Sequence, residues 1–331
     1  MGKPLKIAVG ICTRDNEDTI EETLVSILKQ ERKPDKIIVC DKSRDKTLDI
    51  LRRLSQEHRT PIEILRQSGD GVGDAYQQIY NDLGEETEIL ATLQTNLMVE
   101  SDWLKKIERG FNDNPDVDLI SSYFPLGQEG IYFEHTGGKR GFFTGRNMAI
   151  RLEALRRVNG WDPNLSRGED WDLNIRLWRA GIRSVAVKGI DHRWIKAETM
   201  NTLKKSVRQP TSLTFMAKYG LWYLRFDPVH VFGDLSCVLL LVLLASLPGT
   251  VFINLSYQSQ SPLIVNTAVI ILNTALYVAS YALFYHMKIT VSSLLRTLKH
   301  QVLNGLGFLS ASYRLLFHDH KWNMAGFKNT N

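Results

Sequence analysis

The sequence contains little that points to disulfide, zinc or nucleic-acid chemistry. Its 331 residues include only three cysteines, Cys12, Cys40 and Cys237, each inside an apolar run. An odd number of cysteines among apolar residues indicates small buried side chains in a reducing compartment, and argues against a disulfide framework or a zinc site. No basic run interleaved with aromatic residues is present, so nucleic acid is not favoured as a partner. The first residues lead straight into a strand, and we expect the amino-terminal part to stay in the cytosol.

The imbalance of charge is also small. The formal net charge of +5 fits an acidic small-molecule substrate or an anionic membrane face, but it selects neither. Apolar material is plentiful, because 44% of the residues are hydrophobic. A chain of this length can bury one sizeable core and has residues left over, so we expect one domain with an appendage.

The amino-terminal half alternates apolar strands with helical patterns. Residues 6–12 form a continuous apolar run, helical periodicity follows from Ile20 to Leu28, and residues 36–40 repeat the strand pattern. This is a βαβ unit, in which ligands bind beyond the carboxyl ends of the parallel strands. The polar segments that follow the two strands, 13–16 and 41–45, should therefore lie on the same edge of a sheet. Further strands are expected at 62–65, 88–93, 116–121 and 182–187, with helices ending near Tyr80 and spanning 103–111.

Two adjacent carboxylates stand at the start of a later helix. Leu173, Leu177 and Trp178 recur at helical spacing after Glu169 and Asp170, so this pair should occupy the first turn, beside the partial positive charge of the helix. An acidic first turn also suits the helix dipole without any catalytic role. The preceding segment, with its Gly-Arg-Asn and Gly-Trp-Asp sequences, favours a site.

Several segments together resemble one enzyme family. They are Cys-Thr-Arg-Asp-Asn at 12–16, Cys-Asp-Lys-Ser-Arg-Asp at 40–45 and the segment that ends in Glu169 and Asp170. By motif order, residues 6–193 are similar to family 2 glycosyltransferases. The resemblance implies an α/β domain of the GT-A type, Rossmann-like with a mostly parallel sheet, over residues 1–200. It also implies site residues: Asp170 as catalytic base with Glu169, nucleotide-sugar contacts at Thr13, Arg14, Asp15, Asp41, Gly71, Gln94 and Asn96, and acceptor-side contacts at Gly145, Asn147 and Trp171.

The main departure from the family concerns its metal motif. Where the family carries Asp-x-Asp, this chain has Gln94, Thr95 and Asn96. Amide oxygens carry no charge, so the affinity for Mg²⁺ or Mn²⁺ should fall. Either Asn96 still ligates a weakly held ion, together with His192, or cationic side chains compensate the diphosphate. The candidates for the second role are Arg14, Lys42, Lys139, Arg140 and Arg193.

The composition changes after residue 230. Residues 235–255 and 263–285 are two apolar runs, each long enough to cross a bilayer. Lys and Arg flank the pair but are absent from residues 256–262 between the runs, so we expect a hairpin in the cell membrane with both ends in the cytosol. The expected organisation is an amphipathic interfacial linker at 201–232, two transmembrane helices within 233–286 and an amphipathic tail at 287–331. A third span at 301–317 is left open.

These features predict a membrane-anchored inverting glycosyltransferase that uses a nucleotide-sugar. A lipid phosphate is already largely ionised at neutral pH and needs no base, whereas a sugar hydroxyl does. Glu169 and Asp170 therefore favour a hydroxyl of a lipid-linked, polyprenyl-carried glycan as the acceptor. No Gln-x-x-Arg-Trp follows the pair, which favours one sugar per encounter. A polyprenyl-phosphate sugar synthase, a non-catalytic nucleotide-binding membrane scaffold and a nucleotidyltransferase remain as alternatives.

Overall fold

The computed structural model describes residues 4–122, 145–165, 168–187, 189–190, 192–195, 212–221, 223, 228–257, 261–285 and 306. The chain divides into two compact units, Met1–Glu198 and Thr199–Asn331. The predictions for Lys139 and Arg140, for most of the 201–232 linker and for the 287–331 tail, including the third span, lie outside the described residues, apart from Leu306.

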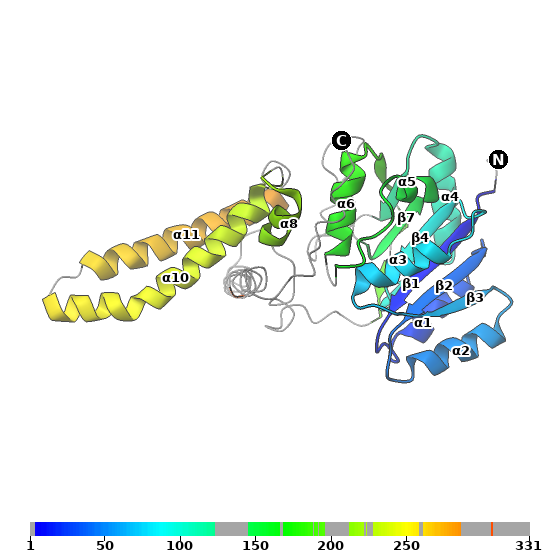
Figure 1. Ribbon diagram of the computed structural model, residues 1–331, viewed down its shortest axis with the longest axis horizontal. Coiled ribbons are helices and arrows are strands. Elements are labelled where there is room, and N and C mark those ends of the chain that lie inside the picture. Colours follow the sequence, from blue (N-terminus) through cyan, green and yellow to red (C-terminus); the bar gives the residue numbers. More distant parts are fainter. Residues whose placement is uncertain are drawn as a thin grey trace. The chain divides into compact units, whose positions relative to one another are not determined.

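The first unit is built on one large sheet (Figure 1). Among the described residues this sheet has seven strands in the order β3-β2-β1-β4-β7-β6-β8. Their bounds are β1 Ile7–Thr13, β2 Lys36–Asp41, β3 Ile62–Arg66, β4 Ile89–Leu93, β6 Leu119–Ser122, β7 Asn147–Arg151 and β8 Ser184–Val187. All neighbouring pairs are parallel except those of β7, which runs antiparallel to β4 and β6. The expected mixed α/β fold with a mostly parallel sheet is confirmed.

The strand order creates a switch point beside β1. From β1 the chain proceeds to β2 and β3 on one side, and then returns to place β4 on the other side of β1. In open α/β sheets, the crevice at the carboxyl ends of two such strands is where ligands bind. Here that crevice lies between the segment after Thr13 and the segment after Leu93. A separate two-stranded ribbon, β5 Leu97–Val99 with β9 His192–Trp194, continues from the same edge.

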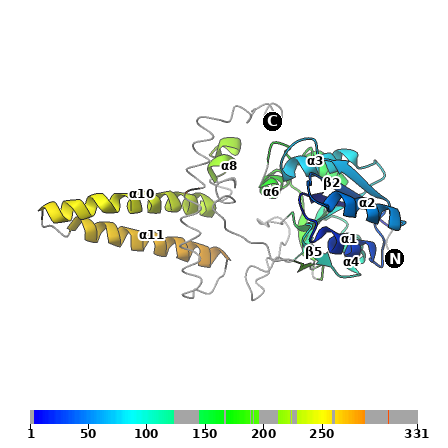
Figure 2. The same ribbon diagram turned by 90° about the horizontal axis from the view of Figure 1, so that it is seen from below.

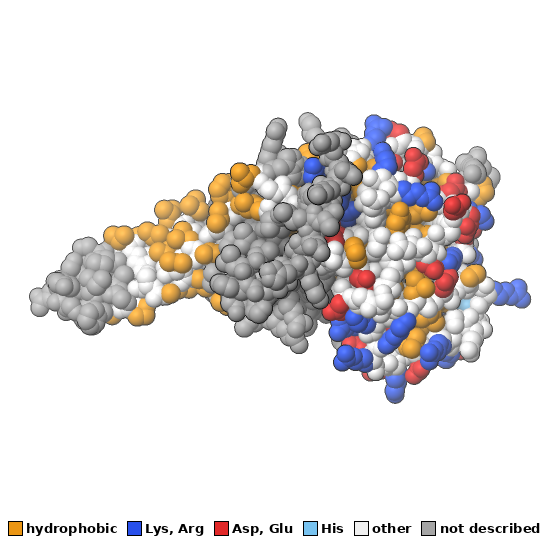
Figure 3. Space-filling model, in the orientation of Figure 1, with side chains coloured by type: hydrophobic (Ala, Val, Ile, Leu, Met, Phe, Trp, Pro, Cys, Tyr) orange, Lys and Arg blue, Asp and Glu red, His pale blue; other side chains and the backbone are white. Residues whose placement is uncertain are grey.

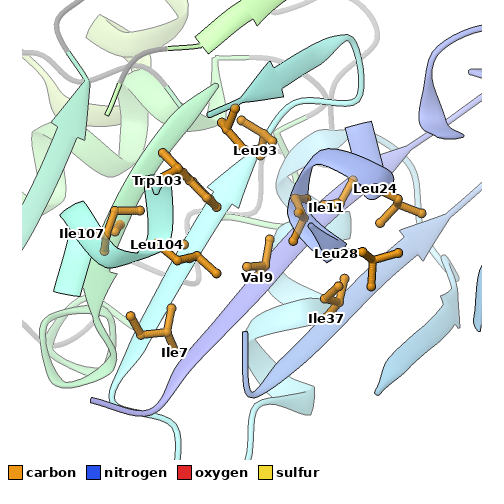
Figure 4. Packing of buried hydrophobic residues seen from close by; sticks show 14 of the residues in the cluster. Ile7, Val9, Ile11, Leu24, Leu28, Ile37, Leu93, Trp103, Leu104 and Ile107 are labelled. Atoms are coloured by element: carbon orange, nitrogen blue, oxygen red, sulfur yellow. The ribbon is translucent and has the colours of Figure 1, made fainter. Parts of the chain in front are cut away.

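Helices cover both faces of the sheet (Figure 2). Their bounds are α1 Ile20–Leu28, α2 Thr47–Glu57, α3 Val72–Asp82, α4 Trp103–Asp113, α5 Leu152–Arg157 and α6 Glu169–Arg179. Successive strand residues point to opposite faces. Ile7, Val9 and Ile11 of β1 thus pack on one face with Leu24 of α1 and Trp103 of α4 (Figure 4). The other face carries a second core, which includes Ala8, Leu90, Ile79, Leu173 and Leu177. Burial on both faces explains why β1 is apolar throughout.

The second unit contains α8 Ser212–Tyr219, α10 Pro228–Tyr257 and α11 Ser261–Tyr285. Helices α10 and α11 lie side by side as a hairpin in both ribbon views. In the described part of the chain, one segment, Val231–Pro248, is long and apolar enough to cross a membrane, and Ile264–Tyr277 is a shorter apolar segment. The first expected span is therefore supported, and the second stays a prediction.

Candidate active site

The loops after β1, β2 and β4 are joined by polar side chains at the switch point. Asn16 Oδ1 accepts hydrogen bonds from Thr13 Oγ1 at 3.1 Å and from Thr95 Oγ1 at 2.9 Å. The backbone N–H of Asp15 donates to Ser43 Oγ at 2.8 Å. Thr13 is buried, with 4% of its surface exposed. The predicted nucleotide contacts Thr13 and Asp15 thus lie on the expected edge, where their polar groups hold the loops together.

Asp41 is also on this edge but is fully covered. Its carboxylate accepts a hydrogen bond from the Ser43 backbone N–H at 3.0 Å and pairs through its other oxygen with the Arg66 guanidinium. The Asp41 side chain is 0% exposed, whereas that of Arg66 is 57% exposed. A ligand at the end of β2 therefore meets the donors of Arg66 before it meets the Asp41 carboxylate.

Three of the predicted cations have carboxylate partners. Arg14 and Lys42 both pair with Asp70 Oδ1, at 3.3 Å and 3.1 Å. The hydrogen bond from Lys42 lowers the pKa of Asp70. Gly71, the predicted contact that follows, begins α3 with a φ of 93°, a left-handed conformation that favours glycine. Arg193 pairs with an exposed glutamate on the neighbouring ribbon, Glu100, at 3.4 Å.

The amide pair at the end of β4 has unsatisfied oxygens. In the part of the chain that the structure describes, Gln94 Oε1 and Asn96 Oδ1 are both buried without a hydrogen-bond partner. Each buried acceptor left unpaired costs roughly 1–3 kcal/mol, and native proteins keep such groups mainly where a function requires them. Donors from a bound molecule or from water would satisfy these two oxygens.

Asp170 lies in the first turn of α6, as predicted. Gly168, with a φ of 73°, turns the chain into the helix just before Glu169. Asp170 Oδ1 accepts a hydrogen bond from the Trp171 backbone N–H at 2.8 Å, and Oδ2 accepts one from Gly145 N–H at 3.4 Å. The predicted residues Gly145, Asp170 and Trp171 are thus brought together.

The surroundings of Asp170 change its acidity. Burial raises the pKa of Asp170, while the hydrogen bonds from Gly145 and Trp171 and the charge of Arg146 act in the opposite direction. Tyr76 lies close by, stacked on Trp161 with 5.1 Å between ring centroids, and burial raises its pKa as well. A carboxylate with a raised pKa is a better proton acceptor once it is ionised, which suits a general base.

Asn147 is buried and connects α4 to β9. Its Oδ1 accepts a hydrogen bond from Trp103 Nε1 at 3.0 Å, which fixes the orientation of the amide. Its Nδ2 therefore donates, to Ile190 O at 2.8 Å and toward His192 Nδ1 at 3.4 Å. This contact favours the tautomer of His192 that carries its ring proton on Nε2. Burial lowers the pKa of His192 to about 4, so the imidazole is neutral at physiological pH.

Arg146 is a site residue that the sequence analysis did not select. Its carbonyl accepts a hydrogen bond from the Gln94 backbone N–H at 2.9 Å. Its guanidinium lies over the Trp194 ring, 5.2 Å from the centroid. Its charge lowers the pKa of both Asp170 and His192. The only available signal was its place in the Gly-Arg-Asn segment, because its neighbours in space come from distant strands.

The residues at the metal position fit a divalent ion poorly. Gln94 and Asn96 offer neutral oxygens, whereas Mg²⁺ and Mn²⁺ prefer carboxylates. No cluster of three His, Cys, Asp or Glu side chains able to hold a metal occurs within the described ranges. Metal ligation by Asn96 and His192 stays a prediction that this donor set does not favour.

Two family models match the chain. The model described as glycosyl transferase family 2 matches residues 8–158, and the model described as glycosyl transferase family group 2 matches residues 126–287. Together the two matched ranges extend from β1 in the first unit to residue 287 in the second unit. A search of curated protein sequences finds no match.

Solved structures share the fold at low identity. The mannosyltransferase PcManGT from Pyrobaculum calidifontis, in complex with GDP-Man and Mn²⁺, is 14% identical, with a TM-score of 0.55 over 95% of this chain and 88% of that chain. S. aureus TarS 1-349 in complex with UDP-GlcNAc is 14% identical, with a TM-score of 0.49 over 67% and 72% of the two chains. Another structure of TarS 1-349 is matched over 55% of this chain and 58% of its own length, at 16% identity and a TM-score of 0.46. The likeness to PcManGT, at this low identity, establishes the GT-A fold alone.

Proposed function

This chain belongs to the family 2 glycosyltransferases, and from that premise we propose that it transfers one sugar from a nucleotide-sugar to a hydroxyl of a lipid-linked glycan, with inversion. The observation that carries the proposal is the Asp170 carboxylate at the start of α6, held by backbone N–H groups of Gly145 and Trp171. The family accounts for the class of enzyme and its use of a nucleotide-sugar. The acceptor and the membrane anchor are the proposed part.

The reaction assigns a proton transfer to Asp170. The acceptor hydroxyl attacks the anomeric carbon on the face opposite the diphosphate, and a new carbon–oxygen bond forms. The bond between that carbon and the diphosphate oxygen breaks, and its electron pair leaves with the nucleoside diphosphate. The hydroxyl proton passes to the Asp170 carboxylate. Because a hydroxyl is a weak nucleophile until it loses its proton, a base at this position supports a hydroxyl acceptor over a lipid phosphate.

The donor is proposed to occupy the switch point between β1 and β4. Sugar and ribose hydroxyls are hydrogen-bond donors, which the unpaired oxygens of Gln94 and Asn96 require. Arg66, half exposed at the end of β2, would meet an acceptor group of the nucleotide. Thr13, Arg14, Asp15, Asp41 and Gly71 remain proposed donor-site residues, acting in part by shaping the loops.

The pattern of side chains on α10 and α11 supports a membrane anchor. Polar groups face the partner helix: Asn273 Nδ2 donates to Ser236 O at 3.0 Å, and Asn266 Nδ2 donates to Ser246 Oγ at 2.8 Å. Apolar groups face outward over the hairpin (Figure 3), among them Val242, 59% exposed, and Leu272, also 59% exposed. A soluble hairpin shows the reverse arrangement, whereas hydrocarbon surroundings favour this one.

Helix length is also adequate for crossing a bilayer. Helix α10 has 30 residues and α11 has 25, while a span needs about 20 residues. A catalytic unit fixed to a bilayer in this way would reach a lipid-linked acceptor without diffusion through water, and the soluble nucleotide-sugar would arrive from the cytosol.

The test is transfer by the purified full-length chain. Labelled UDP- and GDP-sugars are incubated with a lipid extract that contains lipid-linked glycans, and in parallel with polyprenyl phosphate. We expect an elongated lipid-linked glycan, and a loss of about 10²- to 10⁴-fold in the Asp170→Asn variant, the usual contribution of a general base. Asp113→Asn makes the same chemical change on the exposed end of α4 and serves as the control. Full transfer by Asp170→Asn would remove the base assignment, and a product formed only on polyprenyl phosphate would replace the proposed acceptor.

A further inference from the structure

Thr92 is a polar side chain on an otherwise apolar strand. It belongs to β4 and is 0% exposed. Successive residues of a strand face opposite sides, so Thr92 shares its face with Leu90, a member of the second core. The strand register pairs Thr92 with Met148 of β7, which lies in the same core. A hydroxyl buried among apolar side chains needs hydrogen-bond partners, because an unpaired one would destabilise the fold.

The Thr92 hydroxyl holds the backbone of Gly145. Thr92 Oγ1 donates a hydrogen bond to Gly145 O at 3.2 Å. At the other end of the same residue, Gly145 N–H donates to Asp170 Oδ2 at 3.4 Å. A Cβ at position 145 would lie only 3.3 Å from Asp170 Cβ, so the backbone and the aspartate are in close contact. Gly145 therefore connects Thr92 to the carboxylate that we propose as the base.

Tyr76 supports Thr92 from α3. The phenol is 5% exposed, and its hydroxyl is hydrogen-bonded to the side chain of Thr92. The Gly145 carbonyl can only accept, so Thr92 directs its single proton there and its oxygen accepts the proton of Tyr76. Cys12, which is hydrogen-bonded to Tyr76, then donates its S–H to the phenol oxygen. The hydrogen bonds thus run in one direction, from Cys12 through Tyr76 and Thr92 to Gly145.

Ionisable side chains from several elements surround Asp170. Tyr76 lies on α3, and the charges of Glu169 and Asp170 both act on it. Burial raises the pKa of Asp170, and the hydrogen bond from Gly145 N–H opposes this rise most strongly. The charge of Arg146, from the segment before β7, acts in the same direction as Gly145 but more weakly. The position of Gly145 is therefore an important control on the ionisation of Asp170.

We propose that Thr92 is a positioning residue for the base: its hydroxyl, supported by Tyr76, fixes Gly145 so that the Gly145 N–H orients the Asp170 carboxylate toward the acceptor hydroxyl. This inference rests on the proposed function. Each carboxylate oxygen has two lone pairs, so the bond from Gly145 leaves Oδ2 able to accept a proton. Orientation matters because a displacement of about 1 Å at a reacting group can cost about 100-fold in rate.

The test compares variants of the full-length chain in the transfer assay with labelled nucleotide-sugar and lipid-linked glycan. Thr92→Val replaces the hydroxyl with a methyl group, and we expect kcat to fall about 10- to 100-fold with an unchanged KM for the nucleotide-sugar. Thr92→Ser keeps the hydroxyl and should retain most of the native rate. Tyr76→Phe removes only the phenol oxygen and should give a smaller loss, because Thr92 still reaches Gly145.

The acidity of Asp170 provides a second readout, which does not depend on turnover. The hydrogen bond from Gly145 favours the ionised carboxylate, so loosening Gly145 should raise the pKa of Asp170. In Thr92→Val the acid limb of kcat/KM should move to higher pH, whereas in Thr92→Ser it should stay in place. Infrared difference spectra over a pH series follow the same shift without substrate, in the carboxyl band that Asp170→Asn removes.

Ser26→Ala is the matched control. Ser26 Oγ lies on α1, is buried and donates to Thr23 O at 2.7 Å. The variant therefore loses a similar buried hydrogen bond elsewhere in the fold, and it should keep the native kcat and the native pKa of Asp170. Thermal unfolding is recorded for every variant. Thr92→Ala also lacks the hydroxyl and replaces Thr92→Val if that variant does not fold.

Two results would overturn the inference. One is a native kcat together with a native Asp170 pKa in Thr92→Val. The other is an equal loss in Thr92→Val and Thr92→Ser, which would assign the effect to packing instead of the hydroxyl. Both results leave the proposed function standing, provided that Asp170→Asn remains inactive. Full transfer by Asp170→Asn would instead refute the base itself, and the positioning role of Thr92 with it.

Discussion

At the scale of a single residue, burial and neighbouring groups change the pKa of Asp170. Its carboxylate is held by two backbone N–H groups, yet burial outweighs them and raises its pKa. The charge of Arg146 opposes the shift. Burial likewise raises the pKa of the neighbouring Tyr76 above its ordinary value.

The pH profile of transfer should show this shift. A general base is active only when it is deprotonated, so kcat/KM should fall as the pH drops through the pKa of Asp170, which is above the ordinary value of about 3.9. Arg146 favours the ionised carboxylate, so Arg146→Gln should raise that pKa and move the acid limb to higher pH. Initial rates over a pH series measure the acid limb of the native chain and of Arg146→Gln. An acid limb that moves to lower pH in this variant would contradict the electrostatic assignment.

A second prediction at the residue scale concerns the proton on His192. The Trp103–Asn147 hydrogen bond orients the amide, and the amide then leaves Nδ1 of the imidazole as an acceptor. The ¹⁵N spectrum of labelled protein at neutral pH should therefore show the Nε2–H tautomer, identified by the loss of its signals in His192→Gln. In Asn147→Asp a carboxylate replaces the donor, and the proton should move to Nδ1. An Nδ1–H tautomer in the native chain would refute the assignment.

At the scale of elements, α6 both presents the base and holds the loop before it. Asp172 is 0% exposed and accepts a hydrogen bond from Arg176 Nε at 2.8 Å. The same guanidinium donates to Val158 O at 2.7 Å and to Gly160 O at 2.6 Å. The loop that carries Trp161 is thereby fixed against α6, and Trp161 stacks on Tyr76.

This ion pair should be sensitive to the loss of one partner. Arg176→Met takes the guanidinium away from the buried Asp172 carboxylate, and breaking a buried ion pair in this way typically costs about 3–5 kcal/mol. Asp172→Asn combined with Arg176→Met also removes the buried negative charge and should recover part of the loss. Denaturant unfolding followed by tryptophan fluorescence compares the two. A double variant that is less stable than Arg176→Met alone would show that Asp172 has another role.

At the scale of the whole molecule, the second unit, Thr199–Asn331, differs in surface character from the first, Met1–Glu198. Charged side chains are common on the surface of the first unit, while apolar side chains gather along α10 and α11 of the second (Figure 3). The first unit buries its apolar residues in two cores. In the second unit, α10 and α11 contact each other through polar side chains and expose apolar ones.

The full-length chain should behave as an integral membrane protein. It should stay with membranes after alkaline carbonate washing, because the outward apolar surface of the hairpin would be in lipid. Leu272→Arg places a charge near the middle of α11, at a cost of about 2.5–3.5 kcal/mol in a membrane span, and should increase the extracted fraction. Asn112→Arg, at an exposed position of α4 in the first unit, is the control. Complete release of the native chain by carbonate would rule out the anchor.

The orientation of the hairpin gives a further whole-molecule prediction. If both ends of the hairpin are in the cytosol, a cysteine in the segment that joins α10 to α11, Ser259→Cys, should react with a membrane-impermeant maleimide in intact cells. A cysteine that precedes α10 in the chain, Lys218→Cys, should react only after permeabilisation. Labelling of both positions in intact cells would contradict the cytosolic placement of the flanking Lys and Arg residues.

The sequence by itself determined the features that depend on local patterns. Apolar runs identified β1, β2 and β4 to within a residue or two, since strands buried on both faces need such runs. The partly buried edge strand β3 was located by its shorter apolar pattern. The placement of Asp170 in a first helical turn and the change of composition near residue 230 were equally local. The family motifs supplied the class of enzyme.

Tertiary structure alone decided what each site residue contacts. Strand β7 had no distinctive pattern, and only its pairing with β4 places Arg146 beside Gln94 and Asp170. The covering of Asp41 by Arg66 and the burial of Asn147 beneath Trp103 likewise join segments far apart in the chain. Periodicity reports which face of an element is buried, but side-chain partners depend on strand order and register, which nonlocal packing fixes.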